Sequence, residues 1–384
     1  MKVAGLFAGI GGIEYGLSQS GFTTELFCEI MPEAQQILKK NFSQVPIHTD
    51  IKTLKSLPTV DLVSAGFPCQ DLSIAGTKSG MSGLNSSLIA EVFRLIEKAK
   101  KNKPNFLLIE NVPYLLSLNK GEAIRYITKT VEALGYKWAY RIIDPRGFGL
   151  PQRRPRIIFL ASKVIHPKFL LFSQSEISQS GLDDKLIIDS ENNYGFYWTE
   201  GRIGIGWAKD SIPPIKGGSG LGIPSAPAIW MKKNNFFGTP VIEDAERLQG
   251  FPEHWTDDGV GIKKGRRWKL IGNAVNTTVS EWIGQKIKNE VIDGPNPELI
   301  YKLEKSAWPK AAFSEDNKIF GVKTSLSPET KQLIPIDKFL KHPLSPLSER
   351  AAMGFLKRVK ESTIVNYPNE FIFSLEDFIQ DKWA

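Results

Sequence analysis

The sequence predicts an α/β protein with a mostly parallel sheet, a smaller second domain and a C-terminal extension. Three observations lead to this prediction. Short apolar runs end at glycine turns or acidic residues, as strands do in an open α/β sheet. Helix-like apolar periods alternate with these runs. After about residue 166, Gly, Pro, Ser and aromatic residues replace the long amphipathic periods, which indicates irregular loops and short strands.

The composition favours a globular protein with a polyanionic partner. The 384 residues can bury a large core, and the 41% hydrophobic and 23% charged residues are ordinary for a soluble protein. Two cysteines, Cys28 and Cys69, exclude a disulfide scaffold and fit a reducing compartment. The net charge of +8 favours a nucleic acid without proving one. The apolar run at the N-terminus is short and cut by glycines, and no run matches a membrane span, so we expect a cytoplasmic protein.

The first elements predict a ligand site at a strand end. Residues 3–7 form an expected strand, and residues 8–12 form a glycine-rich turn into a helix that begins near Ile13. Backbone amides in such a turn approach a ligand closely. A second strand, 24–28, ends at Glu29, at the spacing where doubly wound folds hold a ribose. On spacing alone, a solvated charge explains Glu29 equally well. A third expected strand ends at Asp50 and Ile51, so an acidic residue again lies at a strand end.

A reactive cysteine is one interpretation of the next strand end. Leu62, Val63 and Ala65 predict a short buried strand, and Gly66 and Pro68 break it just before Cys69. An isolated cysteine is more often a small buried apolar residue, so Cys69 alone is weak support for catalysis. The Gly, Ser and Lys residues of 76–87 predict either a closing loop or a plain connection.

Two further strand ends carry charged residues. A helix over about 87–101 precedes the apolar strand 106–109, which runs into Glu110. A carboxylate there is costly unless it has a partner or a function. After an expected helix at 122–134 and an expected strand at 136–143, Arg154 and Arg156 precede another apolar strand. In an extended segment, residues two apart point to the same side, so the two guanidinium groups can bind one carboxylate or phosphate. The alternative is that both lie on the solvent-facing side of a strand and bind nothing.

Six segments together resemble the DNA (cytosine-5-)-methyltransferase family, of the bacterial restriction-modification type, and occur in the family's order. The segments are Phe7–Gly12, Gly66–Gln70, Glu110–Val112, Gln152–Arg156, Arg247–Pro252 and Gly272–Val275. The resemblance covers roughly residues 3–165 and 240–287. It implies a Rossmann-like, S-adenosylmethionine-dependent methyltransferase sheet.

The resemblance also implies a mechanism on double-stranded DNA. The Cys69 thiolate would add to carbon 6 of a flipped-out cytosine, so that carbon 5 attacks the sulfonium methyl group. Protonated Glu110 would hydrogen-bond the ring, while Arg154 and Arg156 would organise the base, its phosphate and the adduct. The loop after Cys69 would close over the base.

The cofactor and DNA contacts follow from the same resemblance. It implies S-adenosylmethionine, with S-adenosylhomocysteine as product and no metal. The implied cofactor contacts are Phe7, Ala8, Gly9, Ile10, Gly11, Gly12, Glu29, Ile30, Asp50, Ile51, Phe67, Pro68, Asn273 and Val275. The expected DNA contacts are Gln70, Ser73, Arg154, Lys263, Lys264, Arg266 and Arg267. Near the glycines of 217–220, the polar residues Arg202, Lys216, Lys232, Lys233 and Asn234 are also available for DNA, each as a phosphate contact or plain surface unless it reads a base.

These expectations divide the chain into three regions. Residues 1–165, completed by 268–290, form the catalytic and cofactor-binding domain; residues 166–267 form the target-recognition domain; and residues 291–384 form an extension. The helix over 278–290 is expected to fold back beside the first strand. The extension is expected to pack on the rest of the chain because it has enough apolar residues to need burial, with DNA or partner binding as alternatives.

Other functions remain open on the sequence alone. An RNA methyltransferase acting on tRNA is the nearest alternative, and a DNA-binding partner subunit of a defence system is another. A nicotinamide-dependent enzyme leaves Cys69, Glu110 and the two arginines unexplained. We expect a bacterial monomer on DNA that associates with the nucleoid, possesses no membrane segment and has a companion restriction endonuclease or other defence component.

Overall fold

A computed structural model describes most of the chain. The described residues are 1–68, 88–172, 186–217, 226–257, 261–289, 299–302, 307–329 and 331–383, with the backbone alone for 300–302. They form two compact units. Unit 1 comprises Met1–Asp144, Pro155–Ile177 and Val275–Glu329, and unit 2 comprises Pro145–Arg154, Ser178–Ala274 and Thr330–Ala384. Each unit therefore combines segments that lie far apart in the sequence.

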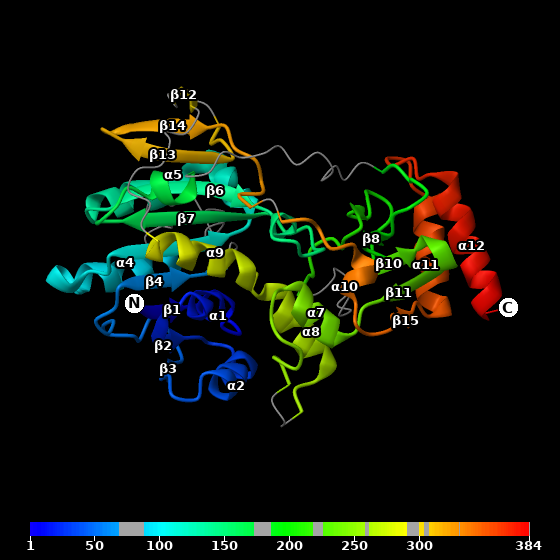
Figure 1. Cartoon of the computed structure of the whole chain (residues 1–384), viewed down its shortest axis with the longest axis horizontal. Helices are drawn as coiled ribbons and strands as arrows, with labels where there is room; N and C mark the ends of the chain where they lie inside the picture. Colours follow the sequence, from blue (N-terminus) through cyan, green and yellow to red (C-terminus); the bar gives the residue numbers. More distant parts are fainter. Residues whose placement is uncertain are drawn as a thin grey trace. The chain divides into compact units, whose positions relative to one another are not determined.

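Unit 1 is built on one mixed sheet, which Figure 1 shows from β12 to β3. Its strands are β1 (Lys2–Leu6), β2 (Thr23–Cys28), β3 (Ile47–His48), β4 (Leu62–Ala65), β5 (Phe106–Asn111), β6 (Lys137–Ile143), β7 (Arg156–Ser162), β12 (Leu299–Lys302), β13 (Ala311–Glu315) and β14 (Lys318–Val322). Their order is β12-β14-β13-β6-β7-β5-β4-β1-β2-β3. The strands from β5 to β3 pair in parallel, and those from β5 to β12 pair antiparallel. In the parallel half, the carboxyl ends of neighbouring strands lie at the same side of the sheet. Most of the predicted site residues in unit 1 follow these strand ends.

The helices of unit 1 follow the predicted alternation with the strands. They are α1 (Gly12–Gln19), α2 (Pro32–Asn41), α4 (Leu88–Lys98), α5 (Glu122–Ala133), α6 (Pro167–Leu171) and α9 (Thr277–Lys288), with the 3-10 turns η2 (Lys100–Asn102), η3 (Pro113–Leu116) and η4 (Leu118–Gly121). The predicted α/β fold is confirmed, with element ends shifted by a few residues. Strand β5 is longer than expected and includes Glu110 and Asn111.

Helix α9 returns to the first helix of the chain. A Cβ atom at Gly16 of α1 would lie 2.2 Å from the carbonyl oxygen of Thr277, so only glycine allows this approach. The hydroxyl of Ser20 donates a hydrogen bond of 3.0 Å to the carbonyl oxygen of Glu281. The predicted return of this helix is therefore confirmed, although its partner is α1 rather than β1.

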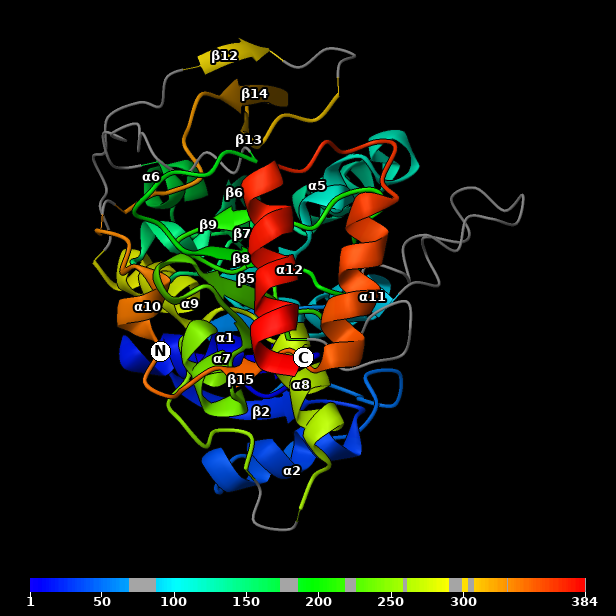
Figure 2. The same cartoon turned by 90° about the vertical axis from the view of Figure 1, so that its right-hand side faces the viewer.

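Unit 2 has an antiparallel sheet in the order β15-β11-β10-β8-β9. The strands are β8 (Tyr194–Phe196), β9 (Ala208–Lys209), β10 (Ala228–Met231), β11 (Phe236–Thr239) and β15 (Ser345–Pro346). The helices are α7 (Ile242–Leu248), α8 (Lys264–Asn273), α10 (Ile336–Phe339), α11 (Glu349–Lys360) and α12 (Asn369–Trp383), with the 3-10 turns η5 (Pro145–Gly147) and η6 (Lys232–Asn234). Figure 2 shows α11 and α12 side by side at the end of the chain.

The C-terminal region is shared between the units. Strands β13 and β14 extend the sheet of unit 1, where β13 pairs with β6. Helices α11 and α12 instead pack on the sheet of unit 2, and Phe355 and Phe371 are fully buried there among aromatic side chains of β8, β10 and β11. The expectation that the extension packs on the rest of the chain is confirmed for its described residues. No described helix combines the length and the apolar character that a bilayer span requires.

Candidate active site

The glycine loop after β1 has an open backbone. Phe7 and Gly9 both have φ of 56°, and Gly11 has φ of 81°, so the chain makes a left-handed turn before α1. A Cβ atom at Gly9 would meet nothing within 4 Å, whereas one at Gly11 would lie 2.7 Å from the ring of Phe42. Gly11 is therefore needed for packing, and Gly9 leaves space in front of the backbone.

Glu29 lies directly against this loop. Its Oε2 accepts a hydrogen bond of 2.7 Å from the amide of Gly9, and its Oε1 accepts one of 2.8 Å from the amide of Met31. The carboxylate is buried, while the next side chain, Ile30, is 69% exposed. The strand-end spacing thus correctly placed an acidic group beside the glycine turn.

Three of the predicted motifs converge on Gly66, at the end of β4. A Cβ atom there would lie 3.9 Å from Oε2 of Glu110, 3.7 Å from Cγ2 of Val275 and 4.0 Å from the carbonyl oxygen of Phe7. The ring of Phe67 lies 6.5 Å from the ring of Phe7, edge to face. One site in unit 1 is thus formed by the ends of β1, β4 and β5 and the segment that leads into α9. Gly66, at its centre, precedes Cys69 by three residues.

Glu110 and Arg156 form a largely buried ion pair. Nε of Arg156 lies 3.1 Å from Oε1 of Glu110, and the side chains are 17% and 11% exposed. This pairing follows from the register of β5 and β7, in which Glu110 lies opposite Ile158, two residues beyond Arg156. Next to it, the side-chain amide of Asn111 donates a 3.0 Å hydrogen bond to the carbonyl oxygen of Phe67. These contacts fix the carboxyl group and the chain that leads to Cys69.

Arg154 has a different environment. It is 3% exposed and belongs to unit 2, where its guanidinium donates to three backbone carbonyl oxygens. The acceptors are Ile215 at 3.2 Å, Gly272 at 2.9 Å and Ala274 at 2.8 Å. Strand β7 begins only at Arg156, so the alternation that predicted a shared face does not extend to Arg154. The role of Arg154 toward the base and DNA stays a prediction.

The structure leaves several predicted residues untested. Asp50 accepts a 2.9 Å hydrogen bond at Oδ1 from the amide of Lys52, and Ile51 is buried. Pro68 is exposed and is the last described residue before a gap. Several predicted features lie outside the described residues: the predicted nucleophile Cys69, the predicted DNA contacts Gln70 and Ser73, the expected closing loop and the residues 218–220.

The basic cluster at the start of α8 divides into two kinds of residue. Lys263, Lys264 and Arg266 are exposed. Arg267 is mostly buried: its Nη2 lies 3.2 Å from Oε1 of the fully buried Glu246, which removes an unpaired charge from the interior. The packing of unit 2 therefore uses Arg267, whereas the surface presents the other three.

Glu14 is a buried acid that the sequence analysis missed. It is 2% exposed, packs against Gly5 of β1 and accepts a 2.5 Å hydrogen bond from the hydroxyl of Ser64 on β4. Burial raises the pKa of this carboxyl group to about 7, from an ordinary value near 4.5. A sequence signal was present, because Glu14 lies next to Ile13 and three residues before Leu17 on the buried face of α1.

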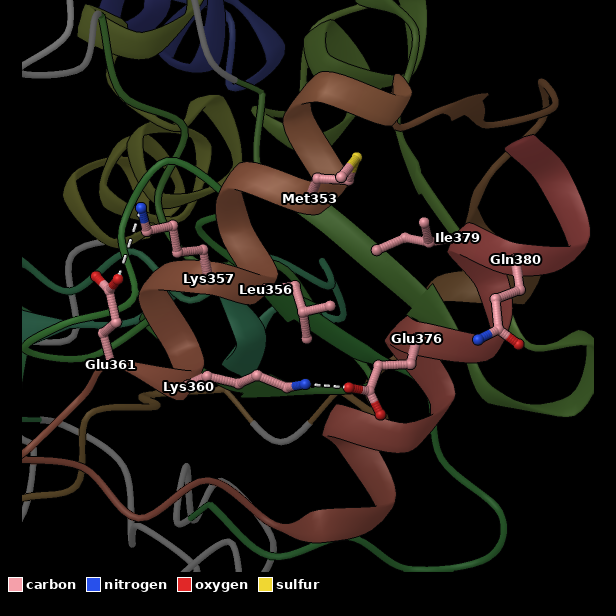
Figure 3. A pocket seen from close by; sticks show the side chains of 8 residues that line it. All are labelled: Met353, Leu356, Lys357, Lys360, Glu361, Glu376, Ile379 and Gln380. Carbon is pink, nitrogen blue, oxygen red and sulfur yellow. Dashed lines mark hydrogen bonds and ion pairs between the residues drawn. The ribbon is translucent and has the colours of Figure 1, made fainter. Parts of the chain in front are cut away.

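A groove of about 540 Å³ lies between α11 and α12. Figure 3 shows the apolar side chains of Met353, Leu356 and Ile379 in it, with the Lys360–Glu376 ion pair beside them. Its lining residues belong to none of the six motifs, so we do not assign it to the active site.

The arrangement defines a class of enzyme. A glycine loop with an adjacent carboxylate can hold a nucleoside cofactor, and a buried carboxyl–arginine pair faces the strand end that leads to a cysteine. A profile of the family described as C-5 cytosine-specific DNA methylase matches residues 1–190. Type II methyltransferase M2.BsuMI of Bacillus subtilis is 51% identical over 382 residues, covering 98% of this chain and 97% of the relative. Type II methyltransferase M.NgoBI of Neisseria gonorrhoeae is 35% identical over 296 residues, covering 73% and 90%.

Solved structures show the same fold. The crystal structure of the S. pombe Dnmt2 methyltransferase aligns with a TM-score of 0.56 and 19% identity, covering 75% of this chain and 99% of that chain. The chain belongs to the C-5 cytosine-specific DNA methylase family. It is a DNA (cytosine-5-)-methyltransferase of the S-adenosylmethionine-dependent class, which confirms the predicted family and activity.

Proposed function

We propose that this enzyme methylates carbon 5 of cytosine within one short double-stranded DNA sequence, through a covalent Cys69 adduct. The convergence of Phe7, Glu110 and Val275 on Gly66 supports this proposal most directly, because Cys69 follows Gly66 by three residues. The type II methyltransferase M2.BsuMI, which resembles the chain over 98% of its length, supports a role in a restriction-modification system. Host DNA protection is the physiological role that we infer.

The reaction requires carbon 5 of cytosine to become a nucleophile. The Cys69 thiolate forms a bond to carbon 6, and the ring electrons move toward carbon 5 and ring nitrogen 3. We propose that Glu110 meets the base in its protonated form and donates a hydrogen bond to ring nitrogen 3, which stabilises the added charge. Nε of Arg156, 3.1 Å from Oε1, donates to the carboxyl group and keeps it in place. After carbon 5 gains the methyl group, a base removes its proton, and elimination breaks the bond to Cys69.

The residues around the glycine loop fit the cofactor. We propose that Glu29 binds the ribose hydroxyls, that the amides near Gly9 approach the methionine portion, and that the exposed Ile30 contacts the adenine. The open space in front of Gly9 supports this assignment, because no side chain fills it. Asp50 and Ile51 would flank the adenine from the next strand end. S-adenosylmethionine supplies, when bound, an electrophilic methyl group, and no metal is needed.

DNA binding combines base flipping with phosphate contacts. The target atoms of cytosine are stacked inside the duplex, so the base must leave the helix to reach Cys69. We propose that Gln70, Ser73 and Arg154 contact the DNA around the flipped base. The exposed Lys263, Lys264 and Arg266 provide phosphate contacts, in agreement with the net charge of +8. Arg267 supports this surface from inside through Glu246.

The partners are proposed from the same family relationship. We propose a companion restriction endonuclease that recognises the same DNA sequence, and a methyltransferase that acts as a monomer on DNA. A bacterial enzyme of this kind works in the cytoplasm, associated with the nucleoid.

Bisulfite sequencing tests the proposal. The protein and its Cys69→Ser variant are expressed in a host that lacks cytosine methylation, and the genomic DNA is sequenced. We expect methylated cytosines confined to one short motif with the wild type and none with the variant. Absence of methylation from folded, cofactor-binding wild-type protein would contradict a DNA substrate, and a parallel assay on tRNA would then test the RNA alternative.

A further inference from the structure

A glycine-rich loop between β8 and β9 presents two exposed side chains. We call Thr199–Gly206 the hairpin loop, because it joins antiparallel strands. Ile203 at its tip is 79% exposed, more than any other large apolar side chain of the described residues. The neighbouring Arg202 side chain is 68% exposed. A single exposed isoleucine is ordinary on a protein surface, but this one lies on a loop whose backbone is held by several side-chain hydrogen bonds.

The residues from Arg358 to Tyr367, which we call the C-terminal segment, hold the backbone of this loop. Three of its side chains, Arg358, Ser362 and Tyr367, donate hydrogen bonds to consecutive parts of the loop and its approach. The acceptors are the carbonyl oxygens of Trp198 at 2.8 Å and Glu200 at 3.0 Å for Arg358, Gly201 at 2.6 Å for Tyr367, and Arg202 at 3.0 Å for Ser362. The backbone is therefore fixed, while the side chains of Arg202 and Ile203 are exposed.

Two glycines fit the loop to its neighbours: Gly201 allows the close approach of Arg358, and Gly206 packs on Tyr197. Gly201 has φ of 143°, and a Cβ atom there would lie 2.9 Å from Cβ of Arg358. Gly206 has φ of 63°, and a Cβ atom there would lie 2.6 Å from the ring of Tyr197. The glycines of the loop are therefore needed for its conformation. A hollow of about 400 Å³ lies between the loop and Arg358.

The base of the loop lies beside a predicted functional segment of unit 2. Nζ of Lys216 pairs with Oε1 of Glu200 and lies 3.6 Å from the centre of the Tyr197 ring. The next residue, Gly217, packs so closely on Asn273 that a Cβ atom would lie 2.6 Å from its Oδ1. The base of the hairpin loop contacts Lys216, and the next residue contacts Asn273 of the last sequence motif, all within unit 2.

We propose that the hairpin loop is a DNA-reading loop, with Arg202 and Ile203 contacting the target duplex. This inference rests on the proposed function. A guanidinium pairs with the major-groove edge of guanine, and an aliphatic tip contacts a thymine methyl group or the face of a base step. Arg358 and Tyr367 are positioning residues, because their side chains bind the backbone of the loop and would not contact the DNA themselves. The C-terminal segment thereby determines which sequence the enzyme methylates.

The ion pair of Arg202 does not oppose this role. Its Nη2 lies 3.1 Å from Oε2 of Glu361, which Figure 3 shows beside Lys357 at the end of α11. Both side chains are well exposed, and exposed pairs contribute little because water and salt screen them. A guanine edge can therefore replace the carboxylate, and Lys357 remains as a partner for Glu361 at 3.8 Å.

The decisive experiment compares methylated motifs. Arg202→Ala and Ile203→Ser are expressed in the methylation-free host, with Arg350→Ala and Ile187→Ser as matched exposed controls in unit 2. We expect both loop variants to methylate additional sequences, with discrimination at one or two motif positions reduced about tenfold or more. The controls should keep the wild-type motif. An unchanged motif and unchanged efficiency in both loop variants would overturn the inference, and would assign the exposed tip to a protein partner or to plain surface.

Positioning is tested separately with Arg358→Met and Arg358→Lys. We expect Arg358→Met to raise KM for DNA and relax the motif, with KM for S-adenosylmethionine unchanged, and Arg358→Lys to restore part of the discrimination. Thermal unfolding of both variants controls for loss of unit 2. A strict motif in folded Arg358→Met would overturn the positioning role. Absence of methylation by the wild type would instead refute the proposed function itself.

Discussion

The active site of unit 1 and the aromatic core of unit 2 are assembled in different ways. In unit 1, each motif follows its own strand directly, and parallel strands bring Phe7, Gly66 and Glu110 to one edge of the sheet. In unit 2, Phe196 and Phe237 of the sheet pack on Phe371, which comes from the last helix of the chain. The candidate site of unit 1 is therefore assembled at local strand ends, whereas the core of unit 2 depends on long-range packing.

This difference separates what substitutions should do. A change at a strand end of unit 1 removes a reacting or orienting group while the core remains intact. A change in the aromatic core of unit 2 weakens the fold that carries the proposed DNA-reading loop. The following predictions test this separation.

Glu110→Gln should give the largest effect, on catalysis. Glutamine keeps the shape but loses the proton-sharing carboxyl group and the ion pair with Arg156. We expect kcat for methyl transfer to fall roughly 10²–10⁴-fold, with KM for S-adenosylmethionine little changed. Steady-state kinetics with tritiated methyl donor measures this, with Glu97→Gln as an exposed control in unit 1. A kcat close to that of the wild type would remove Glu110 from the mechanism.

Phe371→Ala should reduce stability most. The ring is fully buried and lies 5.2 Å from the Trp207 ring and 5.4 Å from the Phe196 ring. We expect a loss of about 3–5 kcal/mol in the free energy of unfolding, because a large cavity remains. Urea unfolding followed by tryptophan fluorescence measures the loss. Phe373→Ala on the same helix is the matched control, since that ring is 58% exposed; equal losses for both would contradict the packing described.

Glu14→Gln should change how stability depends on pH. The folded protein holds the proton of Glu14 up to a pKa of about 7, whereas the unfolded chain releases it near 4.5. The contribution of Glu14 is therefore complete below about pH 4.5 and is lost as the pH rises through about 7. Relative to wild type, we expect Glu14→Gln to gain roughly 1–3 kcal/mol of unfolding free energy from low pH to above neutrality. Chemical denaturation across this pH range checks it, and a pH-independent difference would refute the assignment.

Lys360→Ala should have the smallest effect. Its ammonium group pairs with Glu376 across the groove between α11 and α12, and the lysine side chain is 51% exposed. Exposed pairs contribute about 0–1 kcal/mol because solvent screens them. Urea unfolding should therefore show almost no change beside Phe371→Ala. A loss comparable to that of Phe371→Ala would mean that surface charge, rather than the aromatic core, holds the two helices together.

The sequence correctly predicted where two strand-end carboxyl groups of unit 1 lie, because the rules for strand ends are local. A glycine turn after a strand and a carboxylate at the next strand end correctly located Gly9 and Glu29, whose contact the structure shows. Glu110 was expected to have a partner or a function, and Arg156 is that partner.

Long-range packing escaped prediction. Nothing local indicated that Arg154 would bind the carbonyl oxygens of Gly272 and Ala274, or that β13 would join β6. The division of the C-terminal region between two units depends on pairings between distant segments, and sequence periodicity does not specify partners. The burial of Glu14 also depends on a distant partner, because its carboxyl group bonds to Ser64 on another strand.

Covalent trapping tests the central claim most directly. The substrate is a duplex that contains the short sequence found by bisulfite sequencing, with 5-fluorocytosine in place of the target cytosine. Fluorine at carbon 5 cannot leave as a proton does, so elimination stops and Cys69 stays bonded to carbon 6. We predict a complex that survives denaturing electrophoresis for the wild type with S-adenosylmethionine, and none for Cys69→Ser. A complex with Cys69→Ser, or methylation by the wild type without any trapped complex, would contradict this account.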